Sequence, residues 1–190
     1  MRSLFSKAVV AAAIMTVAIG GTTRAQSGDN DGCSNATLNG DYAFTVSGSF
    51  ITTPPGGAPV TVERLGVAMT HFNGKGGLTQ VDYVASNVPP PALPGMPPGI
   101  PPTDNITGFH INETGTYTVH SDCTGTFAID FPEFSNGWSG AVIETKFVLA
   151  NHGRSIYTVV TSLTPPGPPG SKPVPLPMTS VLISSEGHKL

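Results

Sequence analysis

Apolar and polar residues alternate along most of the chain from residue 40 onward. Near the start of this region, Tyr42, Phe44 and Val46 alternate with Ala43 and Thr45. A period of two residues is typical of β-strands that bury one face, because successive side chains point to opposite sides of a sheet. Outside the first 25 residues, the sequence contains no convincing helical pattern. The chain is therefore predicted to be an all-β protein.

Turns and loops divide the alternating region into eight predicted strands. They cover about residues 41–50, 60–72, 78–86, 105–120, 127–131, 141–150, 154–163 and 178–184. The fourth strand contains an interruption at residues 112–115. In the second strand, the apolar residues first occupy even positions, Val60 and Val62. They then occupy odd positions, from Leu65 to Met69. This change predicts a reversal of the buried face, with Gly66 as a plausible bulge.

Long and short connections alternate between these strands. The long ones, rich in proline and glycine, span residues 52–59, 88–102, 133–140 and 164–177, whereas the short polar turns span 73–77, 121–125 and 151–153. Successive connections of an antiparallel meander lie at opposite ends, and closure of the sheet removes its exposed edges. We therefore predict an eight-stranded up-and-down antiparallel barrel, with the proline-rich loops at one end.

The N-terminal segment has the three-part form of a secretory signal peptide. Arg2 and Lys7 precede an uncharged apolar run, and small residues at positions 23 and 25 predict cleavage after Ala25. A retained N-terminal anchor is the alternative. The expected organisation is a signal peptide at 1–25, a polar leader at 26–39 and one barrel domain at 40–190. The mature protein is then secreted or periplasmic, with no membrane span of its own.

The charge balance argues against a nucleic-acid partner. The full chain has 12 acidic and 9 basic residues. Three of the basic residues, Arg2, Lys7 and Arg24, lie before the predicted cleavage point, whereas every acidic residue lies after it. The mature part is therefore acidic and has no basic stripe with which to displace counterions from phosphates.

Cys33 and Cys123 are the two cysteines of the chain. Both lie in the exported part, where an oxidising compartment favours a disulfide. The barrel topology places both at the end that carries the short turns, so they can come close enough to bridge. A lone reactive thiol and one half of a metal site are the alternatives, but neither cysteine has another cysteine or a histidine at ligand spacing.

The sequence carries no catalytic signature. The histidines at 71, 110, 120 and 152 are scattered, and no His-Glu-x-x-His motif occurs, so no metal site and no cofactor are predicted. No Gly-x-Ser-x-Gly elbow is present, and no glycine-rich phosphate loop precedes a helix. We therefore predict no catalytic residue from motifs alone.

Two carboxylates within the predicted strands, Asp82 and Glu144, could act as a general base if they faced the interior. Asp82 alternates with Val81 and Tyr83, whose apolar side chains are expected to be the buried ones. Asp82 and Glu144 are accordingly expected to face solvent.

Three stretches of the chain resemble a group of small secreted bacterial proteins of unassigned function. The matching segments are Cys33–Phe44, His71–Gly76 and Gly115–Thr126, which fit the patterns C-S-x-A-T-L-x-G-x-Y-x-F, F-x-G-x-G and G-T-Y-T-V-x-x-D-C-T-G-T. The resemblance covers about residues 33–163, and the long proline segments are additions to it. This group is similar in outline to the calycin-like barrels of lipocalins and allene oxide cyclases. The resemblance implies a small barrel but identifies no catalytic residue.

An exported barrel that binds a small apolar ligand is the first functional hypothesis. The side chains expected to contact such a ligand are Tyr42, Phe44, Tyr83, Tyr117, Phe127 and Trp138. These side chains could instead fill the barrel completely. A cyclase or isomerase type of enzyme with an apolar cavity is the alternative, and it requires a buried ionisable residue. A structural module that contacts an envelope or matrix partner is the third hypothesis.

Overall fold

The computed structural model describes residues 32–53, 57–87, 108–133, 137, 139–170, 175 and 181–190. These residues belong to one compact unit that spans Asp31–Leu190. The predicted signal peptide, the start of the polar leader, the whole of the first proline-rich segment and residues 171–174, 176 and 177 of the second lie outside the described residues. Among the described residues, the helical structure is a single 3-10 turn at Asn35–Thr37.

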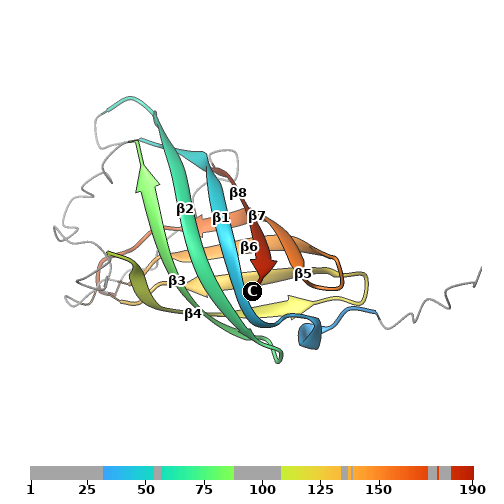
Figure 1. Ribbon diagram of the computed structural model, residues 1–190. Coiled ribbons are helices and arrows are strands. Elements are labelled where there is room, and N and C mark those ends of the chain that lie inside the picture. The colour runs from blue at the N-terminus through green and yellow to red at the C-terminus, as the bar shows by residue number, and fades with distance from the viewer. Residues whose placement is uncertain are drawn as a thin grey trace, which may run out of the picture. The chain divides into compact units, whose positions relative to one another are not determined.

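Eight antiparallel strands form a closed barrel in simple sequence order, as the alternation predicted (Figure 1). The strands are β1 (Asn39–Thr52), β2 (Val60–Asn73), β3 (Gly77–Ser86), β4 (His110–Val119), β5 (Thr124–Asp130), β6 (Val142–Ala150), β7 (Ser155–Thr164) and β8 (Val181–Lys189). The ladder between β1 and β8 closes the sheet. The last strand lies further along the chain than predicted, at 181–189 instead of 178–184.

The short turns lie at one end of the barrel, which we call the turn end, and the strand ends that lead into the long connections lie at the other, which we call the loop end. This arrangement follows from the antiparallel pairing of every strand with its neighbours in sequence. Two described loop segments also meet at the loop end, where the Ser139 backbone N–H donates to the Gly167 carbonyl at 3.0 Å. The link joins the β5–β6 connection to the β7–β8 connection.

The buried face of β2 differs from the prediction. Its pairing with β1 runs without a shift from Asn39↔Asn73 to Thr52↔Val60, so no bulge reverses the strand. Val62 remains inside the barrel, whereas Leu65 is 67% exposed. An unbroken ladder preserves the period of two along the whole strand, and this constraint overrides the hydrophobicity of individual residues.

Aromatic side chains fill the half of the barrel near the turn end. The centre of the Phe72 ring lies 5.3 Å from the ring centre of Tyr42 and 5.1 Å from that of Tyr117, in edge-to-face contacts. It lies 6.4 Å from the ring centre of Phe127. The Tyr117 hydroxyl donates to the Leu38 carbonyl at 2.8 Å. Because rings pack here and their hydroxyl groups are satisfied by the backbone, this half is a packed core.

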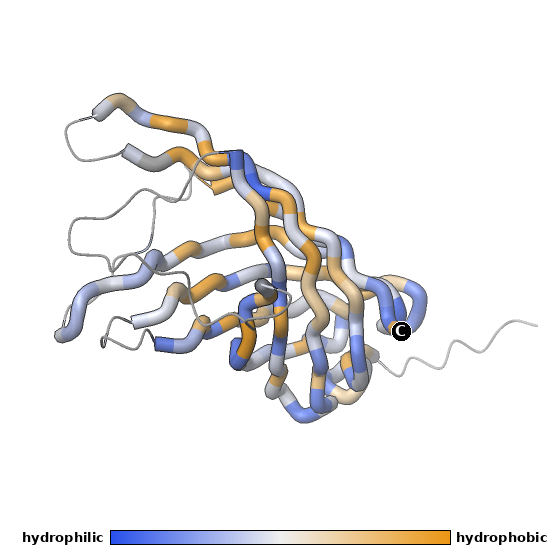
Figure 2. The backbone as a smooth tube through the Cα atoms, turned by 60° about the vertical axis from the view of Figure 1, so that its left-hand side comes forward, coloured by the Kyte–Doolittle hydropathy of each residue, from blue (hydrophilic) through white to orange (hydrophobic). Residues whose placement is uncertain are grey.

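The sheet divides into two layers towards the loop end. Pairing between β3 and β4 ends at Asp82↔His110, and pairing between β7 and β8 ends at Val159↔Ser184. Beyond these two seams, β8, β1, β2 and β3 form one layer and β5, β6 and β7 form the other, while β4 begins at the seam, at His110, and pairs with β5 only from Thr114 onward. Both views show the strands of the two layers diverging in this direction (Figures 1 and 2).

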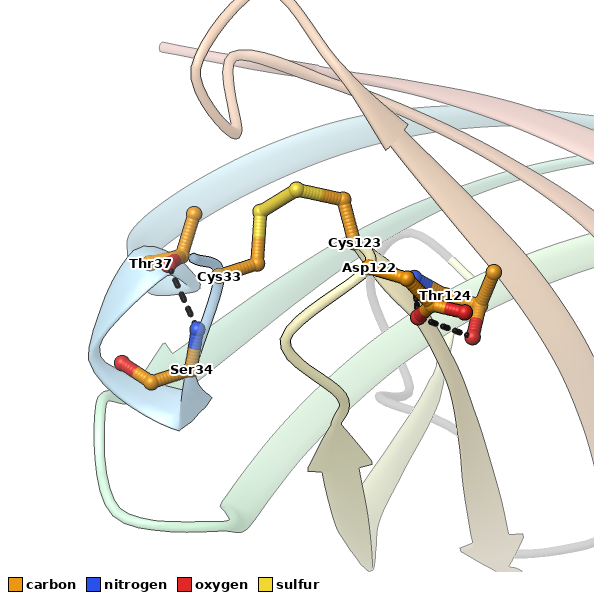
Figure 3. The surroundings of a disulfide bond; sticks show 6 residues. All are labelled: Cys33, Ser34, Thr37, Asp122, Cys123 and Thr124. Carbon is orange, nitrogen blue, oxygen red and sulfur yellow. Dashed lines mark hydrogen bonds between the residues drawn. A yellow bond between two sulfur atoms is a disulfide. The ribbon is translucent and has the colours of Figure 1, made fainter. Parts of the chain in front are cut away.

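Cys33 and Cys123 form a disulfide at the turn end, as predicted (Figure 3). Their Cα atoms are 4.9 Å apart. Local hydrogen bonds hold both sides of the bridge: the Ser34 N–H donates to Thr37 Oγ1 at 3.0 Å, and the Thr124 hydroxyl donates to Asp122 Oδ1 at 2.7 Å. The disulfide joins the segment before β1 to the β4–β5 turn and indicates an oxidising compartment.

Removing this disulfide is expected to destabilise the barrel. The bridge links residues 90 positions apart, so its loss frees a long loop in the unfolded chain. The double variant Cys33→Ser/Cys123→Ser should lose about 4 kcal/mol of unfolding free energy. Urea denaturation under non-reducing conditions measures this loss, with Ser34→Ala as a neighbouring control. Equal unfolding midpoints for the wild type and the double variant would contradict the expectation.

Candidate functional site

Three ionisable side chains meet inside the barrel at the seam between β3 and β4. They are Asp82 from β3 and His110 and Glu113 from β4, and each offers a ligand atom within 4.8 Å of the other two. His110 Nδ1 lies 2.6 Å from Asp82 Oδ1. Asp82 is 7% exposed and Glu113 only 1%. We call these three residues the seam cluster.

A β-bulge in β4 makes this arrangement possible. Gln80 pairs with Glu113 and Asp82 pairs with His110, so the strand pairing advances two residues in β3 and three in β4. Asn112, within this extra length, has a φ of 64°, a left-handed conformation that asparagine tolerates better than most residues. In a regular strand, residues three apart face opposite sides. The bulge changes the phase, and both His110 and Glu113 therefore face the seam.

A chain of hydrogen bonds positions the Glu113 carboxyl group. The Thr70 hydroxyl donates to Gln80 Oε1 at 2.7 Å, and Gln80 Nε2 donates to Glu113 Oε2 at 2.8 Å. The first bond fixes which end of the Gln80 amide faces the carboxyl group. The second oxygen, Glu113 Oε1, is buried and has no hydrogen-bond partner among the described residues.

Burial, and after it the negative charge of the nearby Asp82 carboxylate, raise the pKa of Glu113 from its ordinary value of 4.5 to about 8. The hydrogen bond from Gln80 opposes this shift, because it stabilises the charged form. Glu113 is therefore mainly protonated at neutral pH when no metal ion is bound beside it.

Arg64 lies near the same seam. Its guanidinium carbon is 5.2 Å from the centre of the Phe50 ring, in a cation–π contact. Burial lowers the pKa of Arg64, and the negative charge of Asp82 partly offsets this effect. An arginine remains charged in proteins, so the seam combines an arginine cation with two carboxyl groups and an imidazole.

The predicted faces of β3 are wrong. Asp82, which was expected to face solvent, is buried in the seam cluster, and Tyr83, an expected ligand contact, is 47% exposed. The apolar residues of this strand misled the prediction because the outer face of the barrel carries several of them. The polar partners of Asp82 are instead supplied by β4, which the β3 sequence does not reveal. Glu144 is exposed, as predicted.

The other expected ligand contacts fall into two groups. Four of them belong to the packed core near the turn end: Tyr42, Phe44, Tyr117 and Phe127. Trp138 lies outside the described residues. None of the six predicted contacts therefore belongs to the seam cluster, and their role in ligand binding stays a prediction.

Motif analysis missed His110 and Glu113 because their spacing matches no metal or catalytic motif. The interruption predicted at residues 112–115 was the available signal. It marked an irregular strand, and the structure places the bulge at its first residue, Asn112. Recognising that such an irregularity can bring residues three apart to one face would have identified the pair.

A shallow hollow of about 540 Å³ lies elsewhere, on the outer face of β5, β6 and β7. Its lining includes the exposed side chains of Lys146, Val148, Tyr157 and Val159. No residue of the seam cluster lines it. The hollow and the buried cluster are therefore separate features.

Comparison with protein-family models, with curated proteins and with solved structures gave no match for this chain. Within the part of the chain that the structure describes, no helix has the length and apolar character needed to cross a membrane. The evidence for function therefore comes from the geometry of the site.

The raised pKa of Glu113 predicts a specific dependence of stability on pH. The folded protein retains the Glu113 proton up to a pH of about 8, whereas the unfolded chain loses it near 4.5. Between these values, the folded state binds more protons, so this group makes the unfolding free energy fall as pH rises. The slope is at most about 1.4 kcal/mol per pH unit.

The Glu113→Gln variant should lack this contribution because its side chain stays neutral throughout. Urea denaturation of wild type and variant in metal-free buffer, at several pH values between 5 and 8, isolates the difference. Glu144→Gln, on an exposed position, is the matched control and should follow the wild type. A wild type and a Glu113→Gln variant with parallel pH profiles would disprove the raised pKa.

Proposed function

We propose that this protein is an exported barrel that binds a small, largely apolar ligand between the two layers at its loop end. In this proposal, the seam cluster contacts the polar group of the ligand. The observation that carries the proposal is the meeting of the buried Asp82 and Glu113 with the half-buried His110 where the two layers begin to separate. Ionisable groups are costly to bury and are concentrated at functional sites.

The side chains between the two layers supply the apolar part of the proposed site. A second apolar cluster, separate from the aromatic core, contains Phe50, Val62 and Val181, with Val160 and Leu163 packed against it. Small-molecule sites commonly combine an apolar lining with a few polar groups that fix orientation. This cluster and the seam cluster together provide that combination.

A cyclase or isomerase type of enzyme is the second candidate. It requires an ionisable residue inside the barrel, and the inward position of Asp82 beside His110 meets that requirement. The two candidates differ in what happens to a bound ligand. A binding protein releases its ligand unchanged, whereas an isomerase or cyclase releases a rearranged product of the same mass, which chromatography of the recovered ligand distinguishes.

Ligand binding at the loop end can be tested with the neutral fluorescent probe N-phenyl-1-naphthylamine, whose emission rises in apolar surroundings. Val84 alternates with Asp82 along β3 and is partly buried, so the variant Val84→Trp should place a bulky ring beside the seam and obstruct the proposed site. We expect this variant to bind the probe at least tenfold more weakly than the wild type.

The neighbouring variant Ala85→Trp is the matched control, because Ala85 is exposed. It should bind the probe as the wild type does. Circular dichroism and thermal melting establish that both variants are folded. If the wild type does not bind the probe, or if both tryptophan variants bind it equally, the proposed site is wrong.

Export is the other part of the proposal, and it is supported by the signal-like first 25 residues together with the disulfide. Expression of the full chain in a Gram-negative host should deliver a processed protein to the periplasm or the medium. Intact-mass measurement should show a mature chain that begins at Gln26. A cytoplasmic protein that retains its first 25 residues would contradict this part.

A further inference from the structure

We propose that the seam cluster is a binding site for one divalent transition-metal ion, with Asp82, His110 and Glu113 as its protein ligands. The proposal rests on the proposed function in one respect, because it takes the seam to be accessible from the loop end. It extends that function by identifying an inorganic ligand and the residues that hold it.

The donor set suits such an ion. Zn²⁺ binds imidazole nitrogen and carboxylate oxygen at about 2.0–2.2 Å, so two ligands of one ion lie within about 4.4 Å of each other. The three donor atoms of the seam cluster lie within 4.8 Å of one another before any ion is bound. Small side-chain movements would therefore complete the coordination. Two carboxylates also supply two negative charges toward a divalent cation, against the one positive charge of the nearby Arg64.

A second observation is independent of this clustering. Glu113 Oε1 has no partner among the described residues, although the Glu113 side chain is 99% buried. Buried polar atoms in folded proteins nearly always have a hydrogen-bond partner or an ion, because an unsatisfied one costs about 1–3 kcal/mol. A cation at the seam would give this oxygen the partner that it lacks.

The surroundings of Glu113 resemble the outer shell of a metal site. Gln80 donates to Glu113 Oε2, and Thr70 in turn donates to Gln80. Such outer hydrogen bonds orient ligand groups and increase metal affinity. Three protein ligands also leave a coordination position open, as in catalytic zinc sites. The polar atom of a ligand that enters between the two layers could occupy this position.

A second histidine–aspartate pair provides an internal control. His71 Nδ1 lies 2.8 Å from Asp41 Oδ1, but both side chains are more than half exposed. The described residues form a metal-ligand group only around Asp82, His110 and Glu113, and this surface pair is not part of it. The surface pair therefore tests whether any His–Asp contact is enough to bind the ion.

The experiment uses the disulfide-bonded protein purified without an affinity tag and treated with a chelator, which is then removed. Isothermal titration with ZnCl₂ should show one ion per chain, and Co²⁺ should produce visible absorption bands that indicate nitrogen and oxygen ligands. The variants Asp82→Asn, His110→Asn and Glu113→Gln should each weaken Zn²⁺ binding at least tenfold. His71→Asn should bind Zn²⁺ as the wild type does.

Glu113→Gln keeps the result interpretable, because it removes a buried acid without changing the shape of the side chain and should remain folded. Failure of the wild type to bind Zn²⁺ or Co²⁺ at 0.1 mM, or unchanged binding by this variant, would overturn the metal site. The fluorescent probe is measured on the same chelator-treated protein. Probe binding without metal binding would refute the metal site alone, whereas metal binding without probe binding would refute the apolar ligand site alone.

Discussion

Closure of the sheet by the β1–β8 ladder is the constraint on which the rest of the structure depends. Once the barrel is closed and the ladders are in register, every strand residue faces either the interior or the outside. The turn half follows directly from this constraint. Its interior is small, and a few large side chains such as Phe72, Tyr42 and Tyr117 fill it. That half provides the rigid base from which the loop half extends.

The loop half departs from this regularity at the two seams. The β3–β4 and β7–β8 ladders end early, and each last pair lies beside polar groups. On one side is the seam cluster; on the other, the hydroxyl groups of Thr158 and Ser185 are 2.6 Å apart. Polar groups inside a barrel reduce its stability unless they are satisfied. Thr158 and Ser185 satisfy each other, whereas Glu113 Oε1 is the buried side-chain atom that lacks a partner among the described residues.

Several features of the fold were predictable from local sequence. The period of two in each strand, and the regular alternation of long loops and short turns along the chain, led to the correct strand count and order. The Cys33–Cys123 pairing followed because the topology placed both residues at the turn end. Face assignment failed in β2 and β3, where Leu65 and Tyr83 are exposed. An outer surface that is partly apolar weakens the contrast on which the assignment relies.

The sequence by itself determined the class of structure. Strand alternation and turn chemistry are local properties, so they do not depend on which strands pair with each other. Only the tertiary structure decided the site. Asp82 and His110 lie 28 positions apart, and their meeting depends on the β3–β4 register. The bulge at Asn112 then brings Glu113 to the same, inner face of the sheet as His110. Register and phase arise from the pairing of whole strands, so no single strand could reveal the cluster.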